Sequence, residues 1–306
     1  MLPAGAALVA VDWGTTRLRA YLIGADGEVL DRATAPESGI QSIPSGGFPA
    51  ARDATCGHWW RHGPDLPVLM AGMVGSRNGW AEAAYVAPPS GPDDLAAGLL
   101  RVADAARPVF IVPGVDCRGP DGSYDVMRGE ETQVVGLDLQ NGVVCLPGTH
   151  SKWVEVVGGR IERFATFITG ELYAALSQSF VGRLARDPDA SEPGLAMAAR
   201  LADLDGGLSR SLFQARTQVL GGAMPPEAVR PFLSGLLIET EIRDARDMFG
   251  EGAEVHLVAG SPQRDPYAEA LARAGIAPKV YDPETTTVAG LVAIARTAGL
   301  LQPAFR

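Results

Sequence analysis

Hydrophobic and polar residues follow one another along this 306-residue chain in a pattern typical of an α/β protein. Short apolar runs between turn residues indicate strands, and apolar residues repeated every three or four positions indicate helices. In the first half the pattern predicts strands over 7–13, 18–24, 27–33, 67–71 and 109–112, and helices over 48–62, 93–106 and 130–138.

The pattern restarts after residue 141 and becomes richer in helix. It predicts strands over 142–146, 152–157, 160–168, 256–259 and 278–281, and helices from 169 and over 193–204, 209–219, 225–249, 264–274 and 286–297. Thr169 is expected to cap its helix, and Pro231 is a candidate break in helix 225–249. Residues 183–193 are expected to form a surface loop.

This repetition predicts a two-lobed α/β fold made of duplicated β-β-β-α-β-α units with a cleft between them. The first lobe is expected to span 1–138 and to be completed by a helix over 286–306. The second lobe is expected to span 139–285.

Two short strings carry the most information about chemistry. Residues 9–20 (VAVDWGTTRLRA) and 145–154 (CLPGTHSKWV) each predict a strand, a Gly-Thr turn and a second strand with a basic residue. A tight glycine turn exposes backbone N–H groups to which a phosphate can come close. Two such turns indicate two lobes that hold one polyphosphate. The candidate phosphate-binding residues are Gly14, Thr15, Thr16, Arg17, Gly148, Thr149, His150 and Lys152.

Composition narrows the choice of partners. The net charge of −10 argues against nucleic acid, because binding to its backbone requires a basic surface. Anionic ligands would then be attracted by local groups near the turns: Arg17, Arg77, Arg128 and Lys152. The sequence shows neither an apolar run of about 18 residues nor a basic-then-apolar leader, so a cytoplasmic protein without membrane contact is expected. Three cysteines without CxxC spacing indicate neither disulfides nor a zinc site.

Three carboxylates are candidates for catalysis. Asp12 ends an apolar strand directly before the first turn and could hold Mg²⁺ through water, since magnesium usually takes one or two protein carboxylates. Arg128, itself a candidate catalytic residue, precedes two acids, Glu130 and Glu131, at the start of a predicted helix. Either acid could accept a proton from a substrate hydroxyl, and Glu130 is the first choice.

A glycine-rich loop after strand 67–71 offers varied polar groups. Its candidate ligand-binding residues are Gly72, Ser76, Arg77, Asn78 and Trp80, and Arg77 suits a carboxylate because its guanidinium can bind both oxygens. The ordinary alternative is a loop anchored by a buried Trp80. Gly260 and Ser261 form a small-residue turn against which a nucleoside could lie. P-loop, GxGxxG and kinase HRD motifs are absent from the sequence.

The motifs resemble those of the 2-dehydro-3-deoxygalactonokinase family, within the actin–hexokinase–heat-shock ATPase superfamily with its ribonuclease H-like lobes. The resemblance covers residues 8–297 and is carried by Asp12-Trp13-Gly14-Thr15-Thr16, Met70–Ser76 with Gly79-Trp80, Val126–Gln133, Pro147–His150 with Lys152-Trp153, Thr169–Leu172 and Ser234–Ile238.

The resemblance implies transfer of the γ-phosphoryl of ATP to the terminal 6-hydroxyl of 2-dehydro-3-deoxy-D-galactonate, a step of galactonate catabolism. It implies Glu130 as the base, magnesium near Asp12, phosphates at 14–16 and 148–150, and adenosine by Gly260 and Ser261. Arg77 is our own candidate for the sugar-acid carboxylate, and Glu131 and Glu171 are further candidate contacts with the substrate.

Two other functions remain open at this point. One is a kinase for another sugar or sugar acid, and the other is an actin-like nucleotide switch that lacks a small acceptor. The sequence does not distinguish galacto from gluco acceptors, and a homodimer is only one of the oligomeric states that it allows.

Overall fold

The computed structural model of this chain describes residues 3–60, 66–103, 107–119, 122–184 and 207–301. The chain folds into two compact units. Unit 1 comprises Met1–Asn141, Val154–Phe164 and Asp282–Arg306, and unit 2 comprises Gly142–Trp153 and Ala165–Tyr281. Within the described ranges, the helices are all too short or too polar to cross a membrane.

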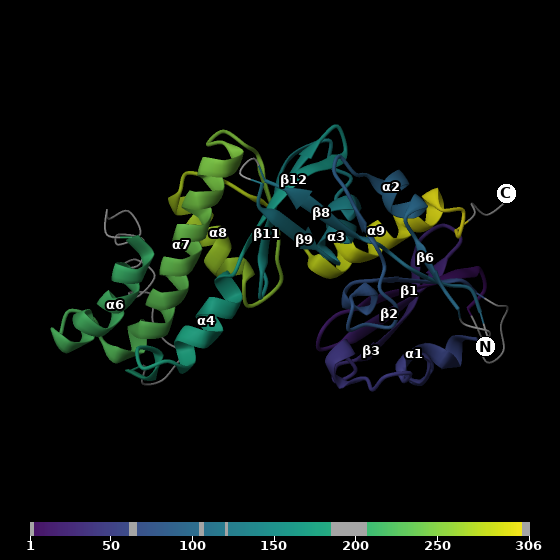
Figure 1. Cartoon of the computed structure of the whole chain (residues 1–306), viewed down its shortest axis with the longest axis horizontal. Coiled ribbons are helices and arrows are strands. Elements are labelled where there is room, and N and C mark those ends of the chain that lie inside the picture. The colour runs from purple at the N-terminus through teal and green to yellow at the C-terminus, as the bar shows by residue number, and fades with distance from the viewer. Residues whose placement is uncertain (1–2, 61–65, 104–106, 120–121, 185–206, 302–306) are drawn as a thin grey trace. The chain divides into compact units, whose positions relative to one another are not determined.

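Unit 1 is built on a six-stranded sheet of order β3-β2-β1-β4-β7-β6 (Figure 1). Its strands are β1 (Ala6–Trp13), β2 (Leu18–Gly24), β3 (Val29–Ala35), β4 (Val68–Ala71), β6 (Leu100–Val102) and β7 (Val109–Ile111). β1 pairs antiparallel with β2 and parallel with β4. The central strands are continuously apolar because α1 (Phe48–Cys56) adds to the core on one face and α9 (Pro283–Thr297) contacts β1 and β4.

Two predicted helices of unit 1 are corrected, and one sheet was missed. The helix predicted over 93–106 is wrong, because α2 (Pro92–Ala97) ends before Gly98 and β6 then pairs antiparallel with β7. A three-stranded sheet was also missed. It consists of β5 (Tyr85–Val86), β8 (Gly114–Arg118) and β9 (Tyr124–Met127). Helix 48–62 is shorter than predicted and passes into a 3₁₀ turn, η2 (Gly57–Trp59). The remaining strands lie within two residues of their predicted bounds.

A close helix crossing brings α3 (Glu130–Gly136) against α9. A Cβ on Gly290 would collide with the carbonyl oxygen of Thr132, and one on Gly136 with that of Thr286. Gln133 Nε2 donates a hydrogen bond to Thr287 Oγ1 at 3.1 Å. This close crossing fixes the helix that begins with the candidate base.

Unit 2 repeats the strand order of unit 1. Its sheet runs β12-β11-β10-β13-β14, which matches β3-β2-β1-β4-β7 position by position. The strands are β10 (Asn141–Leu146), β11 (Ser151–Val157), β12 (Arg160–Phe167), β13 (Val255–Val258) and β14 (Lys279–Tyr281), and residues 154–164 of the hairpin belong to unit 1. The duplication read from the sequence is therefore present in the sheets.

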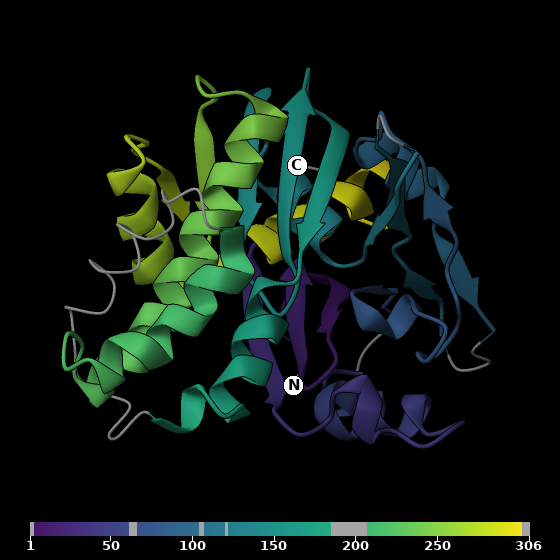
Figure 2. The ribbon, with the colours of Figure 1, turned by 60° about the vertical axis from the view of Figure 1, so that its left-hand side comes forward.

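Helices make up most of unit 2. The long α7 (Val229–Phe249) packs against α4 (Thr169–Gln178), α6 (Gly207–Leu220) and α8 (Arg264–Arg273) (Figures 1 and 2). Pro231 does not break α7, because it lies in the first turn, where a backbone N–H has no partner to lose. Thr169 is not the N-cap: Ile168 holds that position, and Thr169 is the first helical residue. The helix predicted over 193–204 lies outside the described residues.

Gly290→Ala is expected to destabilise unit 1, although alanine favours a helix by about 1 kcal/mol over glycine. The new Cβ would meet the Thr132 carbonyl, and such overpacking costs about 1–3 kcal/mol. Thermal unfolding followed by circular dichroism should therefore show a lower Tm. The matched control is Gly57→Ala, whose Cβ would come no closer than 3.5 Å to a neighbour. A Tm for Gly290→Ala equal to that of the control would contradict the close crossing.

Candidate functional site

The first Gly-Thr turn joins β1 to β2 in unit 1. Gly14 N donates to Arg17 O at 3.0 Å, which closes the turn, and Thr16 and Arg17 are exposed. A segment that follows β3 supports the turn from behind. Gly39 packs so tightly that a Cβ there would collide with the carbonyl of Thr15, and Gln41 N donates to that same carbonyl at 3.3 Å. The turn thus presents its outer side to solvent while its inner side is fixed.

Asp12 lies at the end of β1, directly opposite Arg19 on β2. Arg19 Nη1 donates to Asp12 Oδ2 at 3.0 Å. Burial raises the pKa of Asp12, and the charge and hydrogen bond of Arg19 oppose that rise. Sequence reasoning did not place Arg19 in the site. The sequence does carry a signal for this pairing. Asp12 lies two residues before the hairpin turn and Arg19 two residues after it, so a tight hairpin places them opposite one another.

The Asp12 carboxylate fits a magnesium ion held through water. The described residues include no group of three or more His, Cys, Asp or Glu side chains that could enclose a metal. Magnesium does not require such a group, since it keeps several waters and commonly takes one or two carboxylates plus phosphate oxygens. The bond to Arg19 uses Oδ2, which leaves Oδ1 for a metal-bound water.

The glycine-rich loop after β4 combines an anchored end with polar groups. Trp80 stacks on Phe48 with ring centroids 6.2 Å apart and meets Trp13 edge-on at 6.5 Å, so it ties the loop to the core of unit 1. This agrees with the anchored-loop alternative. Ser76 Oγ is buried and lacks a hydrogen-bond partner among the described residues. Arg77 is 85% exposed and lies 3.6 Å from Glu82, and Asn78 is exposed.

Arg128 fixes the far side of this loop. Its Nη2 donates to the carbonyl of Ala83 at 2.7 Å, and its guanidinium lies 4.5 Å from the ring centroid of Tyr85. Nε and Nη1 are buried without a partner in the part of the chain that the structure describes. The side chain therefore packs beneath the loop that follows Gly75, while its backbone N–H takes part in the helix start described next.

Two carboxylates fold back onto the backbone at the start of α3. Glu130 Oε2 accepts from Arg128 N at 3.0 Å, and Glu131 Oε2 accepts from Gly129 N at 2.6 Å. Glu131 is fully buried and also accepts from the Thr132 hydroxyl at 2.9 Å. Burial, assisted by the nearby charge of Glu130, raises the pKa of Glu131 to about 7. Of the two acids, Glu130 keeps the more accessible side chain.

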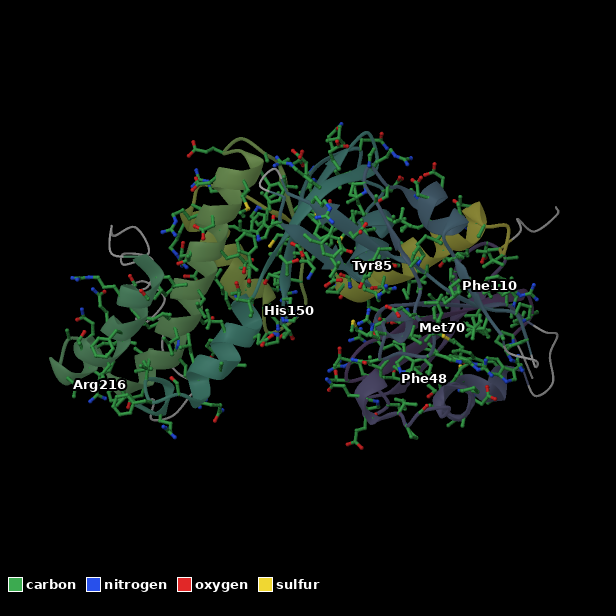
Figure 3. The ribbon with its side chains drawn as sticks, viewed as in Figure 1. Phe48, Met70, Tyr85, Phe110, His150 and Arg216 are labelled. Carbon is green, nitrogen blue, oxygen red and sulfur yellow. The ribbon has the colours of Figure 1, made fainter. Side chains whose placement is uncertain are left out.

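The second Gly-Thr turn, in unit 2, is supported in the same way as the first. A segment that follows β12 packs behind it, and a Cβ on Gly170 would collide with the carbonyl of Gly148. Glu171 N then donates to Thr149 O at 2.9 Å. At the end of the turn His150 Nε2 lies 2.6 Å from Glu171 Oε2, and both side chains are exposed (Figure 3). Lys152 is only 4% exposed within β11.

A cavity of about 370 Å³ opens beside this second turn. Its walls come from the turn, α4, α7 and the start of α8. They are lined by Gly148, Thr149, Thr169, Gly170, Tyr173, Ser234, Leu237, Ile238, Pro262, Gln263, Pro266 and Tyr267. The predicted adenosine turn, Gly260 and Ser261, is followed directly by Pro262 and Gln263, and it is these next two residues that line the cavity.

Behind the cavity lies a buried carboxylate that sequence reasoning missed. Glu241 Oε1 accepts from Trp153 Nε1 at 2.9 Å, and Oε2 accepts from the Tyr267 hydroxyl at 2.8 Å. Burial raises the pKa of Glu241, and hydrogen bonds from Thr169, Trp153 and Tyr267 oppose the rise. The bond from Thr169 explains why its hydroxyl does not cap α4. The sequence does carry a signal for Glu241, because this acid lies on the same face of the predicted helix as Ser234 and Leu237.

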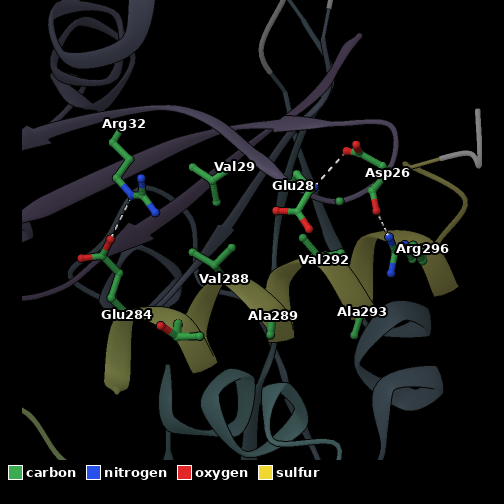
Figure 4. A pocket seen from close by; sticks show the side chains of 12 residues that line it. Asp26, Glu28, Val29, Arg32, Glu284, Val288, Ala289, Val292, Ala293 and Arg296 are labelled. Carbon is green, nitrogen blue, oxygen red and sulfur yellow. Dashed lines mark hydrogen bonds and ion pairs between the residues drawn. The ribbon is translucent and has the colours of Figure 1, made fainter. Parts of the chain in front are cut away.

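Another cavity, of about 440 Å³, lies in unit 1 between α9 and the turn that joins β2 to β3 (Figure 4). Its floor is apolar, with Val29, Val288 and Val292. Its two ends carry the Arg32–Glu284 ion pair and the bond from Arg296 to the Asp26 carbonyl. None of the residues assigned to the site from the sequence lines it.

The chain is similar to proteins of established sequence families. A family model described as 2-keto-3-deoxy-galactonokinase matches residues 12–294. The 2-dehydro-3-deoxygalactonokinase of Escherichia coli (strain K12) is 35% identical over 295 residues, with 94% of this chain and 97% of the relative covered. The family match includes the two turns, the glycine-rich loop and the start of α3.

Solved structures show the fold. A crystal structure from Sinorhizobium meliloti, assigned as a 2-dehydro-3-deoxygalactonokinase, has a TM-score of 0.87 at 33% identity and covers 94% of this chain and 98% of that one. The activator of 2-hydroxyisocaproyl-CoA dehydratase from Clostridium difficile, solved with bound ADPNP, has a TM-score of 0.52 at 12% identity, with 95% and 96% covered. The expected actin-like ATPase fold is thus confirmed.

The raised pKa of Glu131 predicts a pH dependence of stability. The folded state binds this proton more tightly than the unfolded chain, whose glutamate titrates near 4.5. Its contribution to stability is fully present below about pH 4.5 and is lost as the pH rises through about 7. The glutamine of Glu131→Gln stays neutral at every pH. The free energy of unfolding of this variant, relative to that of the wild type, should therefore rise by on the order of 3 kcal/mol between about pH 5 and pH 8.

Urea unfolding of both proteins at the two pH values measures this difference. Glu251→Gln is the control, because the Glu251 side chain is 82% exposed and its loss should leave the pH profile unchanged. Parallel profiles for the wild type and Glu131→Gln would contradict the buried, proton-holding carboxyl.

Proposed function

The chain belongs to the 2-keto-3-deoxy-galactonokinase family and is a kinase of galactonate catabolism, and from this premise we propose how its residues carry the reaction. ATP donates its γ-phosphoryl group to the 6-hydroxyl of 2-dehydro-3-deoxy-D-galactonate. The products are ADP and the sugar-acid 6-phosphate. The family membership removes the alternative of a nucleotide switch without an acceptor.

Unit 2 binds the nucleotide in this proposal. The cavity of about 370 Å³ has apolar walls at Leu237, Ile238 and Pro266, suited to a purine and its ribose. Gly148 and Thr149 line the same cavity, so a nucleoside seated there carries its phosphates to the turn. The exposed His150 and Glu171 lie where the phosphate chain leaves the turn. Lys152, buried in β11, supports the turn from within the strand.

Unit 1 supplies the metal carboxylate and a second set of phosphate donors. Backbone amides and hydroxyls of Gly14, Thr15 and Thr16, with Arg17 beside them, suit phosphate oxygens. Asp12 would hold Mg²⁺ through water, and Arg19 fixes the orientation of its carboxylate. The ion neutralises negative charge on the phosphates when it is bound.

The loop that follows β4 binds the sugar acid in this proposal. Ser76 Oγ is buried and unpaired within the described structure, and such a hydroxyl is stabilised when a substrate oxygen reaches it. Arg77, whose exposed side chain pairs with Glu82 on the surface, binds the substrate carboxylate in this proposal. Trp80 and Arg128 hold the two sides of the loop in place.

Glu130 accepts the proton of the 6-hydroxyl as that oxygen bonds to the γ-phosphorus. The bond between the γ-phosphorus and the β-bridging oxygen breaks, and ADP keeps that electron pair. Phosphoryl transfer requires positioning and charge neutralisation more than covalent chemistry. Glu130 is favoured over Glu131 because Glu131 is buried and already accepts two hydrogen bonds.

The observation that carries the proposal is the pair of Gly-Thr turns, each of which is supported by a closely packed glycine, Gly39 or Gly170. Both turns lie within the residues that the family model matches. The test is ADP release from Mg-ATP with and without 2-dehydro-3-deoxy-D-galactonate, with the gluco epimer as comparison. Strong stimulation by the galacto acid supports the proposal. Equal stimulation by both epimers would contradict selectivity for the galacto acid, and no stimulation by either would contradict the acceptor.

Glu130→Gln should lower kcat by at least about a hundredfold, the usual contribution of a general base. The Kd for ATP, measured by isothermal titration calorimetry, should stay within about twofold of the wild type, because the lost interaction forms only in the transition state. The control is Glu162→Gln, an exposed acid in unit 1. Near-normal kcat for Glu130→Gln would exclude it as the base.

A further inference from the structure

The buried carboxylate of Glu241 connects its own helix, α7, to β11, α4 and α8. It is 2% exposed and lies in α7. Its hydrogen-bond donors are Trp153 on β11 at 2.9 Å, Tyr267 on α8 at 2.8 Å, and the hydroxyls of Thr169 at the start of α4 and of Ser151 at the start of β11. Ser151 Oγ lies 3.0 Å from the Tyr267 hydroxyl and extends the network to the residue next to the second turn.

These elements are also the walls of the nucleotide cavity. Tyr267 and Thr169 line it themselves. α7 contributes Ser234, which lies on the same helix face as Glu241 and two turns before it. β11 begins at Ser151, directly after the turn whose Gly148 and Thr149 line the cavity. Glu241 itself does not line the cavity, so it can act on a nucleotide only through these neighbours.

The chemistry of the network requires a carboxylate. Among the described residues no Lys, Arg or His forms an ion pair with Glu241, so it is held by hydrogen-bond donors alone. The two carboxylate oxygens accept from four side-chain donors, which an amide could not do without turning its NH₂ group toward a donor. Burial of an acid is costly unless it is fully hydrogen-bonded, and apolar packing would fill the same space without that cost.

We infer that Glu241 is a positioning residue for the nucleotide, which sets the second turn, α4 and α8 around one point. The inference rests on the function proposed for unit 2 and deepens it. Tyr267 donates its proton to Glu241, and its oxygen lies 3.0 Å from the Ser151 hydroxyl. Through this chain of bonds the position of the phosphate turn depends on the same carboxylate as the cavity wall.

Tyr267→Phe and Glu241→Gln test the inference by steady-state kinetics. Each should raise KM for ATP roughly tenfold, the equivalent of about 1.4 kcal/mol. KM for the sugar acid should not change, because the sugar-acid loop belongs to unit 1. The double variant should be no worse than the stronger single variant, since both break one network. If Glu241→Gln does not fold, the kinetics of Tyr267→Phe and Trp153→Phe decide.

The matched control is Tyr281→Phe, which removes another aromatic hydroxyl bond in unit 2, 3.0 Å from His256 Nδ1, away from the cavity. It should lower Tm without changing KM for ATP. Equal increases in both KM values, or unchanged KM for ATP in the Glu241 and Tyr267 variants, would overturn the inference. Ser234→Trp, which fills the cavity, separates the two claims: if it leaves ATP binding intact, the nucleotide site itself is misplaced.

Discussion

The structure depends on one type of contact, a glycine backbone pressed against a Gly-Thr turn. Gly39 packs on Thr15 in unit 1, and Gly170 packs on Gly148 in unit 2, with no room for a Cβ at either position. A residue just after each glycine then donates its N–H to the turn. In unit 1 Gln41 donates to Thr15, and in unit 2 Glu171 donates to Thr149. A turn that must present its amides to a ligand cannot satisfy them internally, so it needs support from the opposite side.

The two units share this support but differ in what surrounds it. Unit 1 places carboxylates near its turn: Asp12 on the neighbouring strand, and Glu130 at the start of a helix fixed by the crossing with α9. Unit 2 places an apolar cavity near its turn and ties the walls to Glu241. Under the proposed function, one topology serves two tasks: acid, metal and acceptor chemistry in one copy and nucleotide binding in the other.

Local signals explain what the sequence could predict. The two turns, the hairpins on either side of them and the start of α3 are encoded within about ten residues, and all were found. Leu100–Val102 was missed because a three-residue strand after Gly98 has too little periodicity to be distinguished from a helix. Arg19 and Glu241 were missed for a different reason: their partners Asp12, Trp153 and Tyr267 are defined by register and tertiary packing, which one sequence does not show.

The central claim is that the supported turn in unit 2 binds the phosphates of the nucleotide. Isothermal titration of adenosine, ADP and ATP into the wild type and Gly170→Ala tests it most directly. The wild type should bind more tightly as phosphates are added, and Gly170→Ala should lose about tenfold in ATP affinity and much less in adenosine affinity. Equal losses for adenosine and ATP, or an unchanged ATP affinity, would contradict the claim.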